Sequence, residues 1–515
     1  MNGNIYITGF MGAGKSTIGR ILADMLGRQF VDLDDVLVKR FKMPIAQVFA
    51  EQGEPAFRDG EKTELKALAG ANRLVVATGG GVVMDEANRR VMTNGGTVVW
   101  LKTSLEQCRE RTKSQQGLRP LWQDDKAIRR LFSQRQKLYA MADLTVDTSD
   151  LDPDGVADAI AAALFPDDRF DVIMDHDRSH VIATLNSPRA LAPVTQGRRA
   201  AILVDKTVAR LHLDRYLSAF DSPEVIIVPG GERTKTLKGA EKIYQRLLEA
   251  RFNRDDVLVA IGGGAITDLG AFVAATFKRG MGFVLVSTSL LGVVDAAVGG
   301  KAAVNLGPTK NSVGLFTAPE TVILDSGALA TLTRDGIAEG LIEAYKTGLV
   351  ASKTLAGRVS QGLDSLLAKD RPWLLEISRL SARTKGEVVH SDFTEQGRRA
   401  ILNLGHTFGH AVESCHDFKV SHGKSVALGM IVAARISETR KLISAKLAGE
   451  IIETVRRIVP NMPSAPPMDD AWAIMQHDKK IRKGRLVFVL LKGIGRPVIV
   501  DNVDRDEIAR AVKAL

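Results

Sequence analysis

Short apolar runs alternate with longer amphipathic stretches along the first third of the chain. Runs rich in β-branched residues predict strands at Asn4–Thr8, Gln29–Leu33, Leu74–Ala77, Thr97–Leu101 and Leu144–Val146. Strands that alternate with helices in this way are typical of an α/β fold with a parallel sheet. An alanine-rich stretch, Val156–Leu164, predicts the helix that closes this first pattern.

A polar, acidic segment that contains Pro166 follows at Phe165–Arg178 and predicts a domain boundary near residue 168. A second alternation of strands and helices comes after it. Its predicted strands are Ala201–Val204, Val225–Val228, Val257–Ile261, Phe283–Val286 and Thr321–Leu324. We therefore expect a second α/β domain, over residues 169–326.

From about residue 327 the apolar residues recur with the helical period. The predicted helices are Ile337–Val350, Leu374–Val389, Gly405–Glu413 and Val426–Leu442, with a late hairpin at Arg485–Leu491 and Pro497–Val500. A mainly helical domain over residues 327–515 is expected. Two α/β domains and one helical domain agree with the chain length of 515 residues.

Composition and charge narrow the class of protein. Hydrophobic residues make up 45% and charged residues 25%, the ordinary balance of a globular protein. The start of the chain does not resemble a signal peptide and no run of about eighteen apolar residues occurs, which predicts a cytoplasmic protein without a membrane partner. Cys108 and Cys415 lie too far apart for a CxxC metal motif. The net charge of +10 is scattered, which favours anionic small-molecule substrates over nucleic acid.

A phosphate-binding motif follows the first predicted strand. The sequence GFMGAGKS, Gly9–Ser16, satisfies GxxxxGK[ST] between a strand and a helix, where backbone N–H groups can surround phosphates. Lys15 is expected to contact the phosphate oxygens and Ser16 to ligate Mg²⁺. The other nucleotide-binding residues of this loop are Gly12, Ala13, Gly14 and Thr17. The alternative is a glycine-rich turn before an ordinary helix, which the flanking strand and helix disfavour.

Two carboxylates, Asp32 and Asp34, end the strand that follows, in FVDLDD. Because strand side chains alternate, we expect both on one face. Carboxylates beside a P-loop hold Mg²⁺ through water or take a proton from an attacking hydroxyl. The alternative is an acidic helix N-cap, which fits Asp35 better than it fits the pair.

This first segment resembles shikimate kinase over about 165 residues. The resemblance lies in GFMGAGKSTIGR, FVDLDD, GEPAFRDGE, TGGG, LRPLW and RQKLYAMAD. It implies a P-loop kinase domain that uses ATP with Mg²⁺, and it implies that Asp34, Arg58, Gly80 and Arg135 hold shikimate. Asp34 would also act in catalysis with Lys15, and Arg119 would belong to a lid that closes over ATP. After the last predicted strand the chain reads TSDLDPD, where relatives often carry an arginine near the adenine, so the adenine contacts stay open.

Two further patterns point to a cofactor and a metal in the second half. Gly262, Gly263 and Gly264 follow the strand Val257–Ile261, in the arrangement that suits a dinucleotide pyrophosphate, although such a glycine turn alone is a weak signal. His406 and His410 are four residues apart on a predicted helix and project from one face. Together with Glu343 and His422 they are the candidates for a metal, because one carboxylate and two imidazoles with an open position form a catalytic zinc shell. Three structural core histidines are the alternative.

Residues 178–515 resemble 3-dehydroquinate synthase. The matching stretches are PGGERTK, GGGAITDLGAFVAATFKRG, STSLLGVVDAAVGGKAAVN, PTKNSVGLF, GLIEAYKTG, RRAILNLGHTFGHAVE, SHGKSVALGM and DKKIRKGRLVFVL. The resemblance implies a Rossmann-like NAD-binding domain, a helical metal-binding domain, and Zn²⁺, which Co²⁺ could replace, bound by Glu343, His406 and His422.

The same resemblance assigns the remaining site residues. Catalytic roles would fall to Asp295, Lys301, Lys346, Arg399 and His410. Other substrate contacts would come from Arg279, Asn311, Lys385 and Asn403. The residues along NAD would be Glu232, Lys235, Gly263, Gly264, Asp268, Thr288, Ser289, Lys301 and Lys310.

The implied whole is a bifunctional enzyme of aromatic amino acid biosynthesis. It would phosphorylate shikimate, and it would cyclise 3-deoxy-D-arabino-heptulosonate 7-phosphate to 3-dehydroquinate with release of phosphate and with NAD regenerated. A related sugar-phosphate cyclase or a polyol dehydrogenase is the alternative for the second half, and a non-catalytic ligand sensor is the alternative for both. The sequence leaves the oligomeric state open, with a homodimer through the synthase half as one alternative.

Overall fold

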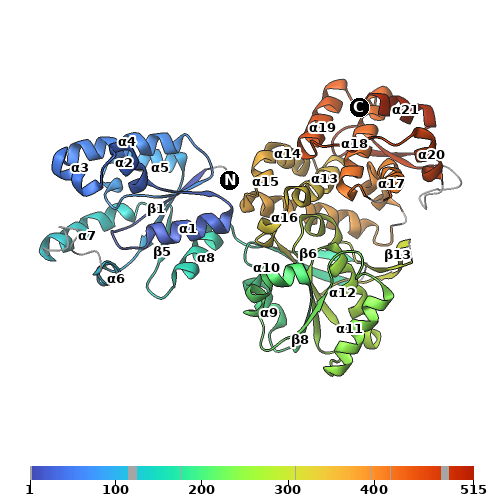
Figure 1. Cartoon of the computed structure of the whole chain (residues 1–515), viewed down its shortest axis with the longest axis horizontal. Coiled ribbons are helices and arrows are strands. Elements are labelled where there is room, and N and C mark those ends of the chain that lie inside the picture. Colours follow the sequence, from blue (N-terminus) through green and yellow to red (C-terminus); the bar gives the residue numbers. More distant parts are fainter. Residues whose placement is uncertain are drawn as a thin grey trace. The chain divides into compact units, whose positions relative to one another are not determined.

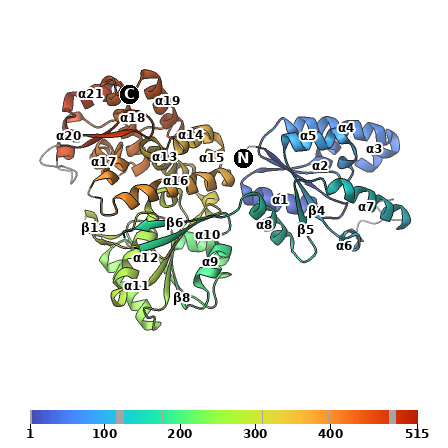
Figure 2. The same cartoon turned by 180° about the vertical axis from the view of Figure 1, so that it is seen from behind.

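The computed structural model describes residues 3–113, 125–175, 177–307, 309–395, 397–417, 419–476 and 486–514. The chain divides into two compact units, Met1–Pro166 and Asp167–Leu515, shown in Figures 1 and 2. Each unit is an α/β structure and is described by itself below. In the described part of the chain, no helix is long and apolar enough to cross a membrane.

The first unit contains a five-stranded sheet with the strand order β2-β3-β1-β4-β5, all parallel. Its central strand β1 is buried along its whole length. The elements in chain order are β1 (Asn4–Thr8), α1 (Lys15–Leu26), β2 (Gln29–Asp32), α2 (Leu33–Phe41), α3 (Ile45–Glu51), α4 (Gly53–Ala69), β3 (Leu74–Ala77), α5 (Glu86–Gly95), β4 (Gly96–Lys102), α6 (Leu105–Arg111), α7 (Asp125–Tyr139), β5 (Leu144–Asp147) and α8 (Pro153–Leu164).

The second unit is built on a seven-stranded sheet with the strand order β6-β7-β14-β11-β10-β8-β9, in which only the β6–β7 pair is antiparallel. The strands are β6 (Asp168–Met174), β7 (Asp177–Thr184), β8 (Ala200–Asp205), β9 (Glu224–Val228), β10 (Val257–Gly262), β11 (Gly282–Ser287) and β14 (Thr321–Asp325). Helices α9 (Ser187–Thr195), α10 (Lys206–Leu217), α11 (Leu237–Glu249) and α12 (Gly264–Thr276) connect them, and a hairpin of β12 (Lys301–Leu306) and β13 (Thr309–Phe316) follows.

Strand β10 shows why this sheet forms. Its six residues are all buried, and they alternate between two hydrophobic clusters, with Leu258 and Ala260 in one and Val259 and Ile261 in the other. A strand covered by apolar residues on both faces is typical of a parallel sheet between two layers of helices.

The C-terminal part of the second unit is mainly helical (Figure 1). Its helices are α13 (Arg334–Ala351), α14 (Lys353–Gln361), α15 (Leu363–Leu367), α16 (Arg371–Ser391), α17 (His406–Cys415), α18 (His422–Thr439), α19 (Ala445–Ile458), α20 (Met468–Gln476) and α21 (Arg505–Lys513), with a hairpin of β15 (Phe488–Leu491) and β16 (Pro497–Val500). Helix α13 is almost wholly buried and contacts α14, α16 and α18. The predicted fold class, two α/β parts and a helical part, is confirmed.

The segment Phe165–Arg178 differs from its prediction as a polar connection. Asp168–Met174 is strand β6, paired along its length with β7 at the edge of the large sheet. Phe170 and Val172 lie within a string of charged residues, so the alternation is hidden in the sequence. An edge strand tolerates such charges because one of its sides has no strand to pair with.

Candidate active sites

The P-loop of the first unit has the geometry of a phosphate cradle. Gly12 and Gly14 have positive φ angles of 84° and 91°, and a Cβ at Gly12 would lie 2.5 Å from the carbonyl oxygen of Cys108. Glycine is therefore needed at this turn. Helix α1 begins directly after it at Lys15, so the backbone N–H groups of a helix N-terminus face the cavity.

Asp32 and Asp34 both line this cavity. They do not lie on one face of a strand, as the alternation of strand side chains had predicted. Strand β2 ends at Asp32, which is the N-cap of α2 and accepts a hydrogen bond from the backbone N–H of Asp34 at 3.0 Å. The pair thus spans a strand end and the first turn of a helix. Ser16 Oγ donates to Asp32 Oδ2 at 2.5 Å, which sets two oxygen ligands side by side, as a hydrated Mg²⁺ requires.

The predicted acceptor side lies around the turn after β3. A Cβ placed on Gly81 would lie 2.6 Å from an Arg58 nitrogen, and one placed on Gly80 would lie 3.6 Å from an Arg135 nitrogen. Both guanidinium groups therefore lie beside this glycine turn, and guanidinium groups are suited to bind a planar carboxylate. Arg135 is buried and its pKa is lowered by that burial.

Glu61 is a buried carboxylate that the sequence reasoning did not single out. It accepts from Arg58 Nη1 at 2.9 Å, while its other oxygen, Oε1, has no hydrogen-bond partner among the described residues. Burial raises the pKa of Glu61, and the charge of Arg58 opposes that increase. It lies within GEPAFRDGE, three residues after Arg58, where the helical spacing was the available signal.

The cavity of the first unit has a volume of about 600 Å³. Of the residues predicted for the nucleotide and the acceptor, it is lined by Gly12, Gly14, Lys15, Ser16, Thr17, Asp34 and Gly80. Ala13 is fully buried beneath the loop, and Arg119 lies outside the described residues. On the side where the adenine contacts were left open, Arg111 and Pro153 line the cavity.

In the second unit, the predicted dinucleotide turn lies at the carboxyl end of β10. Gly263 is the N-cap of α12, and a Cβ on it would lie 3.1 Å from Ser289 Oγ. The Thr288 N–H donates to Gly262 O at 3.0 Å, so the end of β11 is held beside this turn. The turn thus places the N-terminus of α12 at the carboxyl end of β10, the position where a dinucleotide fold binds a pyrophosphate.

A polar cluster joins this turn to the β12–β13 hairpin. Lys235 Nζ donates to Asp268 Oδ2 and to Asn311 Oδ1, both at 2.5 Å. Asn305 Nδ2 donates to Glu232 Oε2 at 2.8 Å. Lys310, which was also predicted to contact NAD, is on β13 next to Asn311. The predicted NAD residues of this region thus come from three separate segments.

Glu343, His406 and His422 form a group whose ligand atoms all lie within 4.8 Å of one another. Glu343 Oε1 lies 3.7 Å from His406 Nε2 and 3.6 Å from His422 Nε2. Ligands about 2.1 Å from a tetrahedral zinc are separated by about 3.4 Å, so this spacing fits one Zn²⁺. Glu343 is buried, and its Oε1 has no hydrogen-bond partner among the described residues. The side chains present therefore fit the metal.

The remaining imidazole nitrogens are held by other groups. His422 Nδ1 lies 2.6 Å from Glu413 Oε1, and His406 Nδ1 lies 3.2 Å from the carbonyl oxygen of Leu404. Such contacts fix the tautomer that presents Nε2 to a metal. Burial by itself lowers the pKa of His422, but the neighbouring carboxylates of Glu343 and Glu413 outweigh it and raise that pKa to about 10. The position therefore favours a positive charge.

Next to this group, cations and anions alternate in a buried cluster. Lys346 is ion-paired with Glu343, and Lys385 Nζ donates to Asp295 Oδ1 at 2.6 Å. Burial would raise the pKa of Asp295, but Lys385 and Lys346 hold it at about 2. Burial also lowers the pKa of Lys385, an effect that Asp295 opposes. The lysines are thus held by carboxylates at the wall of the cavity rather than in solvent.

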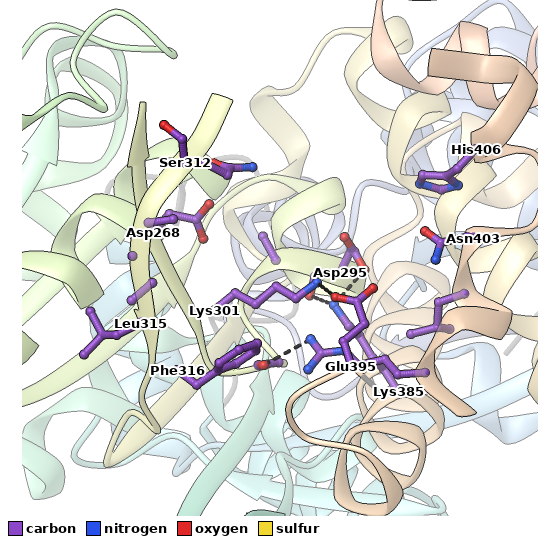
Figure 3. A pocket seen from close by; sticks show the side chains of 18 of the residues that line it. Asp268, Asp295, Lys301, Ser312, Leu315, Phe316, Lys385, Glu395, Asn403 and His406 are labelled. Carbon is purple, nitrogen blue, oxygen red and sulfur yellow. Dashed lines mark hydrogen bonds and ion pairs between the residues drawn. The ribbon is translucent and has the colours of Figure 1, made fainter. Parts of the chain in front are cut away.

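Figure 3 shows how the two parts of the unit face each other across a cavity of about 620 Å³. Asp268, Lys301 and Ser312 come from the sheet side, while Asn403 and His406 come from the helices. Lys301 reaches Glu395, with which it is ion-paired. The predicted residues that line this cavity are Asp268, Asp295, Lys301, Asn311, Lys346, Lys385, Arg399, Asn403, His406 and His410.

Arg279 is not among the residues around the cavity. It ends the short 3₁₀ turn after α12, immediately before β11 begins at Gly282. Helix α12 starts at the carboxyl end of β10 and has 13 residues, a length of about 20 Å, so its end lies at the opposite edge of the sheet. Within this chain, the structure does not bring Arg279 to the other predicted phosphate contact, Asn311.

Two acidic residues of this site were missed by the sequence reasoning. Glu413 contacts the metal ligand candidate His422, and Glu395 pairs with Lys301. Glu413 lies one helical turn after His410, which was a usable signal. Glu395 lies 94 residues from its partner, so no local pattern could have indicated the contact.

Comparisons with known proteins agree with the division of the chain into two units. The family models that match are shikimate kinase over residues 11–165, the N-terminal part of 3-dehydroquinate synthase over residues 225–339, and its C-terminal part over residues 340–481. The 3-dehydroquinate synthase of Acinetobacter baylyi is 38% identical over 340 residues, which cover 64% of this chain and 93% of that protein.

A solved structure, 2-epi-5-epi-valiolone synthase from Streptomyces hygroscopicus subsp. jinggangensis with NAD⁺ and Zn²⁺ bound, matches with a TM-score of 0.60 and 26% identity, over 65% of this chain and 95% of that one. A bifunctional shikimate kinase/3-dehydroquinate synthase from Thermotoga maritima is 31% identical over 494 residues, 96% of each chain. Because that similarity extends over both units, the chain belongs to the family of bifunctional shikimate kinase/3-dehydroquinate synthase enzymes.

Proposed function

We propose that the chain phosphorylates shikimate in the cavity of the first unit and cyclises 3-deoxy-D-arabino-heptulosonate 7-phosphate in the cavity of the second. The observation that carries the second assignment is the Glu343, His406 and His422 group, because His406 lines the same cavity as Lys346, Lys385 and Arg399. A metal beside several cations suits a substrate that carries a hydroxyl to be oxidised, a carboxylate and a phosphate.

In the kinase, the P-loop backbone and Lys15 hold the ATP phosphates, and Ser16 with Asp32 holds Mg²⁺ through oxygen ligands. Arg58 and Arg135 clamp the shikimate carboxylate, which directs the ring hydroxyls towards Asp34. Asp34 accepts the proton of the hydroxyl that attacks the γ-phosphate. The protein thus contributes mainly position and charge, as is usual for phosphoryl transfer.

In the synthase, Glu343, His406 and His422 hold Zn²⁺, and the turn at Gly263 with Lys235 and Asp268 holds NAD. When bound, zinc supplies a Lewis acid next to the substrate hydroxyl, and NAD supplies a hydride acceptor that is restored at the end of the cycle.

The chain's own residues bind the substrate and move its protons. Lys385 and Arg399 anchor the anionic groups of the substrate, and Lys346 stabilises negative charge that develops on its oxygen atoms. His410 lines the same cavity one helical turn after His406, where it can exchange a proton with the substrate as phosphate leaves. The cavity surrounds the ring while it opens and closes again, which keeps the reactive intermediate from water.

The small-molecule substrates follow from the two families. The cytoplasmic location and the homodimer through the synthase half are part of the proposal, and so are the three domains over residues 1–168, 169–326 and 327–515.

Product identification tests both assignments at once. The full chain is supplied with shikimate and ATP, and separately with heptulosonate phosphate and NAD, and the products are identified by mass. Shikimate 3-phosphate and 3-dehydroquinate are expected. As a matched control for the cationic cluster, an analogue in which the heptulosonate carboxylate is an alcohol should bind at least about tenfold more weakly, since it cannot pair with Lys385 or Arg399. Failure to form 3-dehydroquinate from the authentic substrate would overturn the second assignment.

A further inference from the structure

We propose that strand β6, the first element after the kinase unit, is a positioning element of the synthase. It packs on helix α16 and thereby sets the location of Lys385. This inference rests on the proposed synthase function. Figures 1 and 2 both show β6 next to α16, and the two elements are in contact. Helix α16 carries Lys385 to the cavity.

One face of α16 packs on β6. Arg379, Arg383 and Gly386 follow the i, i+4, i+7 spacing that places side chains on one stripe of a helix. Asp168 accepts from Arg383 at 2.7 and 3.1 Å and lies 3.8 Å from an Arg379 nitrogen. The Arg383 guanidinium also lies over the ring of Phe170, 4.1 Å from its centre.

Gly386 makes the closest contact of this face. A Cβ at Gly386 would lie 2.8 Å from Val172 Cγ2 and 3.2 Å from Cγ1, closer than carbon atoms approach each other. Val172 is buried on β6 and is β-branched, so rotating its side chain does not remove the conflict. Helix and strand are therefore as close as a glycine allows, and we expect a side chain added at Gly386 to displace α16.

Movement of α16 would change the position of Lys385 at the wall of the cavity. Lys385 precedes Gly386 and is held on its other side by Asp295, whose backbone and side-chain oxygens both accept from Nζ. The η5 turn that carries Asp295 (Gly292–Ala296) packs on α16 as well. Lys385 thus lies on a helix fixed between β6 and η5, and β6 acts through the helix without touching the substrate.

Gly386→Ala in the full chain is the direct test. Alanine favours a helix over glycine, but the new methyl is crowded by buried Val172, so the thermal midpoint should stay the same or fall by a few degrees. The displaced helix should nevertheless raise KM for heptulosonate phosphate about tenfold. KM for NAD should stay within about twofold, because the Gly263 turn is on other elements. Gly449→Ala, in helix α19, is the matched control, since a Cβ there meets no atom within 4 Å.

The double variant Val172→Ala with Gly386→Ala separates positioning from a general structural effect. Alanine at Val172 leaves its Cβ 3.6 Å from the new methyl, an ordinary contact. KM for heptulosonate phosphate should therefore return towards the wild-type value. Asp168→Asn should raise the same KM in the same direction, by about twofold to threefold, because the ion pair is partly exposed.

Four outcomes would overturn the inference. The first three are an unchanged KM in Gly386→Ala, a double variant as impaired as the single one, and a fall in thermal midpoint accompanied by equal losses for both substrates. The fourth is an unchanged KM in Asp168→Asn. In each case the wild-type chain still converts heptulosonate phosphate. Absence of that conversion in the wild-type chain would count against the proposed function instead.

Discussion

The two cavities of this chain are similar in size and in their place on a sheet, but they are built in different ways. The glycine turn before α1 lines the cavity of the first unit, and Asp268, on the helix after the glycine turn at Gly263, lines the cavity of the second. Their volumes are about 600 Å³ and about 620 Å³. The phosphate-binding end of the kinase cavity comes from one continuous loop. The synthase cavity needs the sheet, the β12–β13 hairpin and α13, α16 and α17.

The difference follows from what each cavity has to hold. A nucleotide phosphate can be held by backbone N–H groups, which a short sequence supplies. The synthase cavity instead contains buried side chains of both signs, among them Glu343, Lys346 and Lys385. Buried charges are tolerated only when they are paired, so each of them depends on a partner from another element. Variants can test how far each cavity depends on these pairs.

The largest effect is expected for Glu343→Gln. The amide has the same shape but no charge, so it weakens Zn²⁺ binding and leaves Lys346 without its partner. We expect the synthase turnover to fall about a thousandfold, a loss of about 4 kcal/mol. Phosphate release and the zinc content of the purified protein measure this.

Shikimate phosphorylation in the same Glu343→Gln sample serves as the control and should be unchanged. A full zinc complement in the variant would remove Glu343 from the metal site. Chelation of the wild-type chain, followed by addition of Mg²⁺ alone, should reproduce the variant: the kinase recovers and the synthase does not.

Lys15→Ala should impair the kinase and leave the synthase unchanged. It removes the one P-loop side chain that carries charge to the phosphates, so kinase turnover should fall about a hundredfold or more while synthase turnover is retained. Asp34→Asn is the companion variant for the acceptor side and should lower the kinase turnover to a similar extent. A kinase rate equal to wild type in both would contradict the assignment of this cavity.

Asp295→Asn should change the pH dependence of the synthase. Without this carboxylate, burial lowers the pKa of Lys385 further, so kcat/KM for heptulosonate phosphate should fall about tenfold and its alkaline decline should start at a lower pH than in wild type. A pH profile that keeps the wild-type alkaline limb would show that Asp295 does not act on Lys385.

Asp295 should also affect the thermal midpoint, with a definite sign. Its pKa in the folded state is about 2, below the ordinary value of about 4, so ionised Asp295 stabilises the fold above pH 4 and loses that contribution between about pH 4 and 2. The difference in midpoint between wild type and Asp295→Asn should therefore be largest near neutral pH and shrink as the pH falls through this range.

Glu61→Gln should have a smaller effect, confined to the kinase. The amide keeps the volume of Glu61 but loses the charge that holds Arg58. KM for shikimate should rise about fivefold to tenfold, whereas KM for ATP should not change, since Arg58 contacts the acceptor side only. Equal changes in both constants would indicate that Glu61 supports the whole unit.

The sequence predicted most of the sheet strands because apolar runs bounded by glycines and polar residues mark buried parallel strands. Strands Asn4–Thr8 and Leu74–Ala77 begin and end as predicted. Strands β6 and β7 and the β12–β13 hairpin were not predicted. The charged residues of β6 lie at the edge of the sheet and the polar residues of the hairpin lie at the cavity, where the pattern reflects exposure and function. Strand β7 begins with the polar residues Asp177–His180, which hide its buried second half.

Local spacing on a helix indicated His406 and His410 as site residues, although only His406 of this pair belongs to the metal group. The contact of Glu395 with Lys301 could not be predicted, because 94 residues separate the two along the chain. Asp32 shows a third limit: a carboxylate at the end of a strand can equally begin a helix, and in this chain it caps α2. Local patterns therefore predict which chemistry is present better than they predict what holds it in place.

The smallest effect is expected when the chain is divided between Pro166 and Asp167. Asp167 accepts from Thr184 at 2.7 Å and from Arg189 at 3.0 Å, so it belongs with the synthase, whereas a cut after Asp168 would also remove the ion pair to Arg383. The two reactions share no intermediate, because 3-dehydroquinate must lose water and gain two electrons before it becomes shikimate. Fragments 1–166 and 167–515 should each retain turnover within about twofold of the parent.

A synthase fragment that begins at Asp177 lacks β6, and it should lose most of its turnover or fail to fold. If instead 167–515 is inactive and recovers when 1–166 is added, the kinase unit supports the synthase directly. If the fragment from Asp177 is fully active, β6 is dispensable.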